Sequence, residues 1–246
     1  MFDYQSPADL LENRIIAVTG AGSGIGRAAA LSFARHGATV ILIGRTVPTL
    51  EQVYDEIEKS GGPQPAIFPM DLRTQNADDY LLLANTIDRE FGRLSGLLHN
   101  AALLGEISPL QNVELSTWLE VMQVNVNAGF ALTRYLLPLM QREKDASVIY
   151  TSSTVGREAR AFWGPYAVSK AADEMLMQVF HLELEKTSGV RVNSVNPGAT
   201  ATRMRARAFP AENPRTLKKP ADIMPVYLYL MGKDSIGISG QQLNAQ

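Results

Sequence analysis

Short apolar runs alternate along the chain with longer segments that mix apolar and polar residues. The runs are rich in β-branched residues and are bounded by turn residues, which predicts strands covered on both faces. They occupy residues 15–20, 38–44, 65–70, 94–100, 146–152, 190–196 and 238–244, the last with the weakest pattern. The longer segments have the length of helices and lie near residues 24–36, 46–60, 76–91, 114–143 and 165–187.

This alternation of strand and helix predicts the fold class. It is typical of right-handed β-α-β crossovers, which build a doubly wound parallel sheet. We therefore expect an α/β protein with a Rossmann-type sheet of about seven strands and helices on both faces. No linker, repeat or low-complexity tract interrupts the sequence, so we expect residues 1–246 to form a single domain.

Composition narrows the class of protein further. The formal net charge is −2, so no overall basic field would attract nucleic acid or an anionic membrane. The chain has no cysteine, which excludes disulfides and thiol catalysis, and its three dispersed histidines predict no metal site. The acidic residues 1–14 do not resemble a secretory signal, and no apolar run is long enough to predict a membrane span. We expect a cytoplasmic protein.

The stretch TGAGSGIG, residues 19–26, places four glycines between the first predicted strand and the first predicted helix. A Walker A loop would need a Lys followed by Ser or Thr, and G-x-G-x-x-G fits from neither Gly20 nor Gly22. The spacing that remains is T-G-x-x-x-G-x-G, through Gly20, Gly24 and Gly26. Such a turn still aims the N–H groups and dipole of a helix at a phosphate, which predicts dinucleotide binding. The alternative is a flexible turn that binds nothing.

The end of the second predicted strand indicates which dinucleotide. An NAD site has an acid there for the ribose 2′-hydroxyl, whereas this chain has Arg45 and no acid before Glu51. An arginine can pair with the 2′-phosphate of NADP(H) through two hydrogen bonds, and Ser23 can add another. We therefore predict NADP(H) as cofactor. In the alternative interpretation, Arg45 is a solvated surface residue.

Three further residues have the pattern of an acid–base site. Pro165 suits the first turn of a helix, which then places Tyr166 and Lys170 on one face. A neighbouring ammonium lowers the pKa of a phenol toward the range in which it exchanges protons near neutral pH. Ser153 follows the fifth predicted strand, where a parallel sheet presents side chains to a ligand.

Together these motifs resemble the short-chain dehydrogenase/reductase family over essentially the whole chain, and more narrowly a bacterial subgroup of unassigned substrate. Residues 19–26 resemble its cofactor motif, and the spacing of Ser153, Tyr166 and Lys170 matches that of the family. The resemblance implies that Tyr166 exchanges the proton, Lys170 holds the nicotinamide ribose and Ser153 bonds the reacting oxygen. Asn125 would position a water beside Lys170, or alternatively would have only a structural role.

The resemblance also implies the other cofactor contacts. Asp71 matches an acid that contacts adenine, and residues 196–202 match a segment that closes over the nicotinamide. Thr202 would bond the carboxamide or would cap the segment that follows it. The remaining expected contacts are Ile25, Leu72, Asn100, Pro197, Gly198 and Thr200.

The chain departs from the family pattern where it reads His99-Asn100-Ala101-Ala102. There we expect a slightly displaced loop, with His99 bonded to backbone rather than catalytic. In the family, helices at positions 114–143 and 165–187 pair between subunits, which implies a homodimer or homotetramer.

Residues 199–220 correspond to a mobile lid over the substrate in the family. This segment has six basic residues and one acid, Glu212. A basic lid would attract an anionic substrate; alternatively, its arginines form a solvated face. Phe162 and Trp163 would form an apolar wall or would simply pack beneath the lid.

We expect an NADP(H)-dependent oxidoreductase that transfers a hydride between the nicotinamide and a small-molecule carbonyl or alcohol. The alternatives are a 3-oxoacyl-thioester reductase and a non-catalytic NADP(H) sensor.

Overall fold

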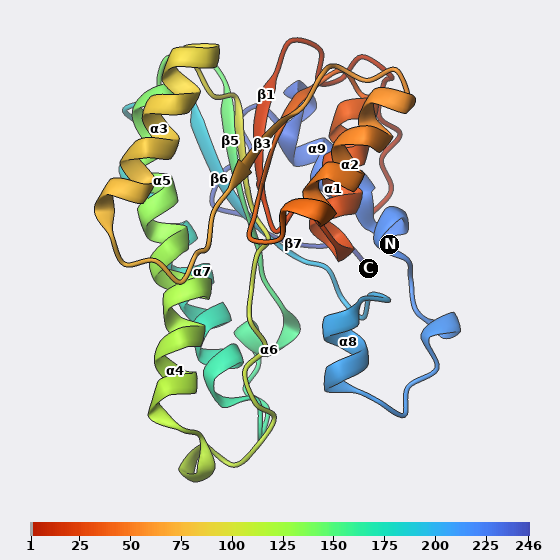
Figure 1. The fold of residues 1–246 in the computed structure, drawn as a ribbon, viewed down its shortest axis with the longest axis vertical. Helices are drawn as coiled ribbons and strands as arrows, with labels where there is room; N and C mark the ends of the chain where they lie inside the picture. Colours follow the sequence, from red (N-terminus) through yellow and green to blue (C-terminus); the bar gives the residue numbers. More distant parts are fainter. Residues whose placement is uncertain (1) are drawn as a thin grey trace.

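A computed structural model describes residues 2–246 and shows one parallel sheet between two layers of helices (Figure 1). The order across the sheet is β3-β2-β1-β4-β5-β6-β7, and each neighbouring pair is parallel. Every predicted strand range contains one of these strands, and the predicted fold class is confirmed. The strands are β1 Ile15–Thr19, β2 Thr39–Gly44, β3 Ala66–Pro69, β4 Gly96–His99, β5 Ala146–Thr151, β6 Val190–Asn196 and β7 Gln242–Asn244.

The helices agree with the expected segments in all but one case. The predicted helix over residues 114–143 is divided by a π-helical turn, Gln123–Asn127. Three helices were not predicted: α6, α8 and α9. The α-helices are α1 Gly24–Arg35, α2 Val47–Lys59, α3 Ala77–Phe91, α4 Leu115–Met122, α5 Ala128–Met140, α6 Thr154–Arg157, α7 Gly164–Leu184, α8 Arg203–Ala208 and α9 Met224–Met231. Short 3-10 helices cover Leu110–Asn112, Pro214–Thr216, Pro220–Ile223 and Lys233–Ser235.

Side chains alternate between the two faces of each strand, and this alternation divides the core into two parts. Ile16 and Val18 of β1 pack with the buried residues of α1, α2 and α9, whereas Ile15 and Ala17 pack with those of α3, α5 and α7. All four side chains are at most 8% exposed. Burial on both faces explains why the strands read as nearly continuous apolar runs.

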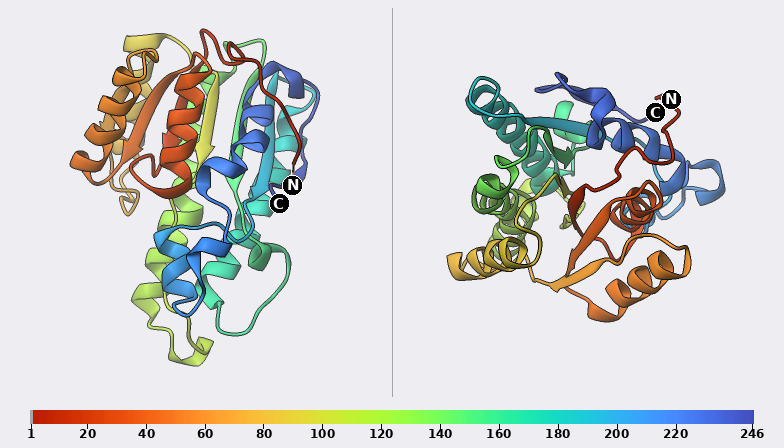
Figure 2. Two further views of the ribbon diagram at one scale, coloured as in Figure 1. Left: turned by 90° about the vertical axis from the view of Figure 1, so that its right-hand side faces the viewer. Right: turned by 90° about the horizontal axis from the view of Figure 1, so that it is seen from above.

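The order of the strands reverses next to β1, which pairs with β2 on one side and β4 on the other. In doubly wound sheets, the crevice for a ligand lies at the carboxyl ends of the strands beside such a reversal. Figure 2 shows α4, α8 and the start of α7 extending beyond this edge of the sheet. The reversal therefore marks where the candidate site should lie.

Within residues 2–246, no helix has the length and apolar character needed to cross a membrane.

Candidate active site

A cleft of about 1170 Å³ lies at the carboxyl edge of the sheet and gathers most of the predicted site residues. Those that line it are Gly20, Ser23, Gly24, Ile25, Arg45, Asp71, Leu72, Asn100, Ser153, Tyr166, Lys170, Pro197, Gly198, Thr200 and Thr202. Two predicted residues, Gly26 and Asn125, lie behind its wall. The sequence separates these residues by up to 182 positions, and the parallel strands bring them to one edge.

The turn between β1 and α1 needs its glycines for two reasons. Gly20 and Gly24 have φ angles of +66° and +55°, which a side chain makes costly. A Cβ on Gly26 would lie 2.4 Å from the Gly20 carbonyl oxygen and 2.5 Å from the Asn100 amide nitrogen. Gly26 therefore permits close packing of helix against strand, while Gly20 and Gly24 form the turn that faces the cleft.

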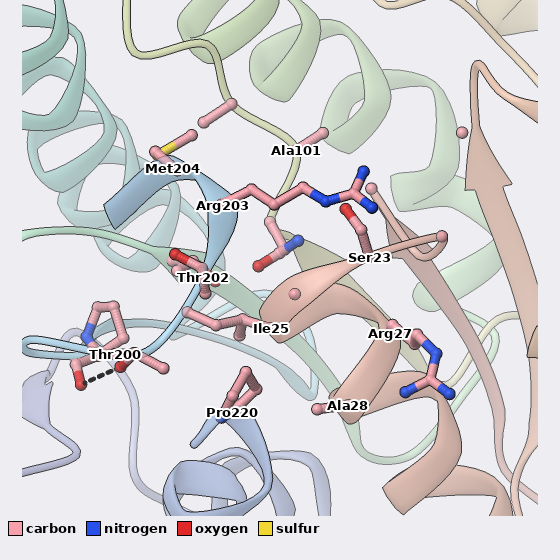
Figure 3. Close-up of a pocket in the computed structure, with 18 of the residues that line it drawn as sticks. Ser23, Ile25, Arg27, Ala28, Ala101, Thr200, Thr202, Arg203, Met204 and Pro220 are labelled. Atoms are coloured by element: carbon pink, nitrogen blue, oxygen red, sulfur yellow. Dashed lines mark hydrogen bonds between the residues drawn. The ribbon is translucent and has the colours of Figure 1, made fainter. Parts of the chain in front are cut away.

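One end of the cleft carries arginines. Arg45, which follows β2, and Ser23 are both exposed and line this end. Arg203 lines the cleft as well, and in Figure 3 its side chain extends from α8 in the direction of Ser23. Asp71 is also exposed, and its carboxylate accepts a hydrogen bond from the backbone of Arg73 at 3.1 Å. This end of the cleft suits an anionic group.

Two helices position the predicted acid–base residues. Ser153 is the residue before the short helix α6, and Tyr166 and Lys170 lie one turn apart on α7. The Lys170 ammonium donates to the Thr151 carbonyl oxygen at 2.8 Å and to Asp173 Oδ2 at 2.9 Å. Its nitrogen lies 5.9 Å from the centre of the Tyr166 ring. Burial opposes the charge of Lys170, but Asp173 and Tyr166 together hold its pKa above the usual value.

Asn125 lies in the π-helical turn, and both the oxygen and the nitrogen of its side-chain amide are hydrogen-bonded. The amide oxygen accepts from the Leu103 N–H at 2.7 Å, and the amide nitrogen donates to the Leu103 carbonyl and to Ser169, each at 2.9 Å. These bonds tie the turn to the loop after β4 and to α7. A role in holding a water stays a prediction, and the observed contacts are those of the structural alternative.

The segment after β6 is held by two predicted site residues, Thr200 and Thr202, and by Gln246, which the sequence did not single out. The Gln246 amide donates to the Pro197 carbonyl at 2.7 Å, and Thr200 donates to the same oxygen at 3.2 Å. The Thr202 hydroxyl accepts from the Arg205 N–H at 3.1 Å, so Thr202 caps α8, as one of its two alternatives expected. No sequence motif identified Gln246, because its contact depends on the packing of β7 against β6.

An apolar wall lies beside Tyr166. Trp163 packs against Tyr166 and against Phe209 of the expected lid, with ring centres 6.0 and 5.6 Å apart, and Leu104 belongs to the same cluster. The sequence grouped Phe162 with Trp163, but Phe162 is 56% exposed and does not line the cleft. Its φ of +75° turns the backbone so that only Trp163 enters the wall.

The basic segment over the cleft is partly neutralised. Arg205 pairs with Glu212 at 2.6 Å and its guanidinium lies 3.8 Å from the centre of the Phe209 ring. Arg203 and Lys219 also line the cleft. The segment thus combines an apolar inner side with cationic groups at the mouth of the cleft.

Two buried titratable residues under the cleft, His99 and Asp173, differ from what the sequence predicted. His99 was expected to bond backbone, but its ring nitrogen pairs with the Thr133 hydroxyl at 2.8 Å. Burial, assisted by the charge of Lys170, lowers the pKa of His99 to about 3. Asp173 was not predicted as part of the site. Its only signal was a carboxylate three residues after Lys170, on the stripe of α7 that faces the sheet.

Among residues 2–246, no group of three or more His, Cys, Asp or Glu is placed to hold a metal ion.

Residues 14–213 match the short chain dehydrogenase family. The chain is 51% identical to the uncharacterized oxidoreductase YciK of Escherichia coli K12, over 99% of this chain and 96% of the relative. Its structure resembles that of a Pseudomonas syringae protein described as a short chain dehydrogenase, with 54% identity, a TM-score of 0.97 and full coverage of both chains. A short chain dehydrogenase of E. coli CFT073 crystallised with NADPH has 51% identity and a TM-score of 0.95, over 98% of this chain and all of that one.

The fold, the glycine turn and the Tyr166–Lys170 helix thus belong to a Rossmann-type oxidoreductase. The chain is a member of the short chain dehydrogenase family.

Proposed function

We propose that this protein is an NADP(H)-dependent oxidoreductase that interconverts a carbonyl compound and the corresponding alcohol. The observation that carries the proposal is that the glycine turn, Arg45, Ser153, Tyr166 and Lys170 line one continuous cleft. The relative crystallised with NADPH supports the choice of cofactor.

The residues of the cleft fit such a cofactor. Gly20 and Gly24 keep side chains out of the turn, so that its backbone and the start of α1 are open to a pyrophosphate. Arg45 and Ser23 would hold the 2′-phosphate, and Asp71 and Leu72 would border the adenine. Lys170 would hold the nicotinamide ribose, with the segment from Pro197 to Thr202 beside the nicotinamide.

When bound, NADP(H) supplies or accepts the hydride. The Tyr166 hydroxyl would give a proton to the carbonyl oxygen in reduction and take it from the alcohol in oxidation. Ser153 would orient that oxygen by a hydrogen bond. The ammonium of Lys170 lies near the Tyr166 ring and so would stabilise negative charge on the phenol oxygen while the proton is away.

The apolar cluster beside Tyr166 supports a substrate whose carbonyl carries apolar substituents. Trp163, Leu104 and Phe209 exclude water from one side of Tyr166, which strengthens the polar interactions of the reacting oxygen. Arg203 and Lys219 at the mouth also accommodate the anionic end of a longer substrate. A 3-oxoacyl thioester has both features and is the second candidate.

Cofactor choice is tested by titrating the purified protein with NADPH and with NADH, following nicotinamide fluorescence. We expect tighter binding of NADPH. Arg45→Ala removes about 1.5–3 kcal/mol of charge-assisted hydrogen bonding, which corresponds to a loss of roughly 10- to 100-fold in NADPH affinity. NADH affinity should change little, and Arg89→Ala, an exposed arginine on α3 paired with Glu90, serves as control. An unchanged ratio of the two affinities in Arg45→Ala would refute the assignment.

The enzyme is distinguished from an NADP(H) sensor by Tyr166→Phe. We expect this variant to bind NADPH like the wild type but to oxidise none of it when given a panel of aldehydes, ketones and 3-oxoacyl thioesters. If the wild type binds NADPH and is as inactive as Tyr166→Phe on the whole panel, the sensor is favoured.

We further infer that the protein forms a homodimer or homotetramer. Helices α4, α5 and α7 expose large apolar side chains: Leu119, Phe130, Met175, Val179 and Leu182 are 42–66% exposed. Burying such a surface against a second copy removes it from water. Sedimentation at micromolar concentration should give a mass above 26.9 kDa; a species of that mass alone would refute the inference.

A further inference from the structure

The catalytic helix carries a buried acid beneath the cleft that the proposed chemistry does not use. Asp173 and Lys170 form an ion pair at 2.9 Å, and their side chains are 3% and 4% exposed. The second carboxylate oxygen, Oδ1, is buried and has no hydrogen-bond partner among residues 2–246. Taking two charges out of water is costly, and their attraction offsets this cost only when further hydrogen bonds satisfy their remaining polar atoms. Oδ1 of Asp173 lacks such a bond, so stability alone does not account for the pair. The pair therefore requires an explanation in the function of the site.

Other titratable groups surround the pair. His99, across from it on β4, is neutral because burial holds its pKa at about 3. Glu174, the next residue on α7, acts on both members of the pair more weakly than they act on each other, and is itself paired with Arg157 of α6 at 2.7 Å. Burial raises the pKa of Tyr227 on α9, so its hydroxyl is uncharged near neutral pH. Each member of the pair therefore has the other as its main charged partner, at 2.9 Å. Burial raises the pKa of the Asp173 carboxyl, and the charge of Lys170 opposes that rise.

A small cavity of about 10 Å³ connects these groups. It is lined by His99, Asn125, Lys170 and Asp173, among others, and Lys170 also lines the main cleft. Asp173 therefore lies one side chain away from the part of the cleft assigned to the nicotinamide ribose. At such short range and with little intervening water, its charge acts strongly on a charged ligand.

We propose that Asp173 is an internal counter-ion that offsets part of the charge of Lys170 under the nicotinamide, and so allows the cationic ring of NADP⁺ to bind beside that lysine. This inference rests on the proposed function. The oxidised ring carries one positive charge and the reduced ring carries none. An uncompensated buried ammonium would therefore repel NADP⁺ and leave NADPH almost unaffected. Asp173 thereby acts as a positioning and specificity residue for the oxidation state of the cofactor.

The ratio of the dissociation constants for NADP⁺ and NADPH measures this effect without any substrate. NADPH is titrated by its fluorescence and NADP⁺ by displacement of bound NADPH, at one pH and ionic strength. Asp173→Asn keeps an oxygen that accepts from Lys170 but removes the charge. We expect the ratio to rise at least about threefold, mostly through weaker NADP⁺ binding. A merely structural role would weaken both cofactors alike and leave the ratio unchanged.

Two further variants identify the source of the effect. Glu174→Gln removes the same charge from the same helix, but from a carboxylate that pairs with Arg157, and should leave the ratio within about twofold of wild type. Lys170→Met combined with Asp173→Asn removes both charges, and should bring the ratio back toward that of the wild type even though both cofactors bind more weakly. Should Asp173→Asn fail to fold, Asp173→Ser removes the same charge with a smaller side chain and should shift the ratio in the same direction.

The outcomes separate this inference from the proposed function. If the wild type binds neither NADP⁺ nor NADPH, the proposed function fails, and this inference with it. If the wild type binds both but the folded Asp173 variants leave the ratio unchanged, only the counter-ion role is overturned. An equal shift in Glu174→Gln would also overturn it, because the effect would then reflect any lost negative charge on α7.

Discussion

His99 makes the stability of the fold depend on acid in a way that can be calculated. The ring is 8% exposed, pairs with Thr133 and stacks on Tyr150 with ring centres 4.4 Å apart. Its pKa is about 3 in the folded protein, against 6.5 for an unperturbed histidine. Because the folded value is lowered, only the unfolded chain binds this proton in the range between them. Stability is therefore full above pH 6.5 and falls as the pH drops toward 3.

The size of the loss follows from the two proton-binding equilibria. Between pH 7 and pH 5 the unfolded chain gains about 2 kcal/mol from protonation of His99, whereas the folded protein gains almost nothing. A change of one unit in the folded pKa barely alters this figure, because that pKa lies far below 5. The prediction thus depends on the burial of His99 rather than on the precise value.

Urea unfolding at pH 7 and pH 5, at fixed protein concentration, measures this loss. The variant His99→Gln keeps a neutral polar side chain that can bond Thr133 but does not titrate. We expect the wild type to lose about 2 kcal/mol more than His99→Gln between the two pH values. His181→Gln, at a partly exposed histidine on α7, is the control and should keep the behaviour of the wild type. Equal losses in the wild type and His99→Gln would show that His99 is not buried as a neutral ring.

Two other substitutions test the packing of the fold. Gly26→Ala should lower stability by roughly 1–3 kcal/mol in thermal or urea unfolding, because its Cβ would lie 2.4 Å from the Gly20 carbonyl oxygen. Gly129→Ala, whose nearest neighbour would be 3.4 Å away, is the matched control, and a similar loss in both would contradict the steric argument. Asp145→Asn should cost roughly 2–4 kcal/mol at pH 7, because Asp145 pairs with both Arg14 and Arg191 at 3.0 and 2.7 Å. Those arginines lower its pKa against the opposing effect of burial, so the difference between wild type and variant should shrink as acid protonates the carboxylate. The exposed Asp88→Asn, which breaks a surface pair with Arg142, should cost much less, and an equal cost would argue against a special contribution from the partly buried network.

The sequence predicted the strands well because their pattern reflects burial on both faces. Ile15 to Val18 lie inside two separate cores, so no polar residue interrupts the run and the strand can be recognised locally. The glycine turn was also predictable, since the positive φ of Gly20 and Gly24 is a local demand on the backbone. These features depend on a few consecutive residues, and the sequence shows them directly.

Features that arise from packing between distant segments were not predictable. The π-helical turn at Gln123–Asn127 leaves the helical periodicity almost intact, so residues 114–143 read as one helix. The contact of Gln246 with Pro197 exists only because β7 pairs with β6. Asp173 looked like one acid among many on a long helix, until the structure placed it in the core beside Lys170.

His99 and Lys170 show why partners, rather than burial alone, decide charge in this site. Both side chains are at most 8% exposed and both line the same small cavity, so desolvation disfavours the cation in each. His99 faces a hydroxyl, which cannot compensate a positive charge, and the ring stays neutral. Lys170 faces the carboxylate of Asp173, which restores the lost stabilisation, and the ammonium persists. Without Asp173, no paired carboxylate would compensate the charge of Lys170. That charge would then act on the cleft, where the cofactor is proposed to bind.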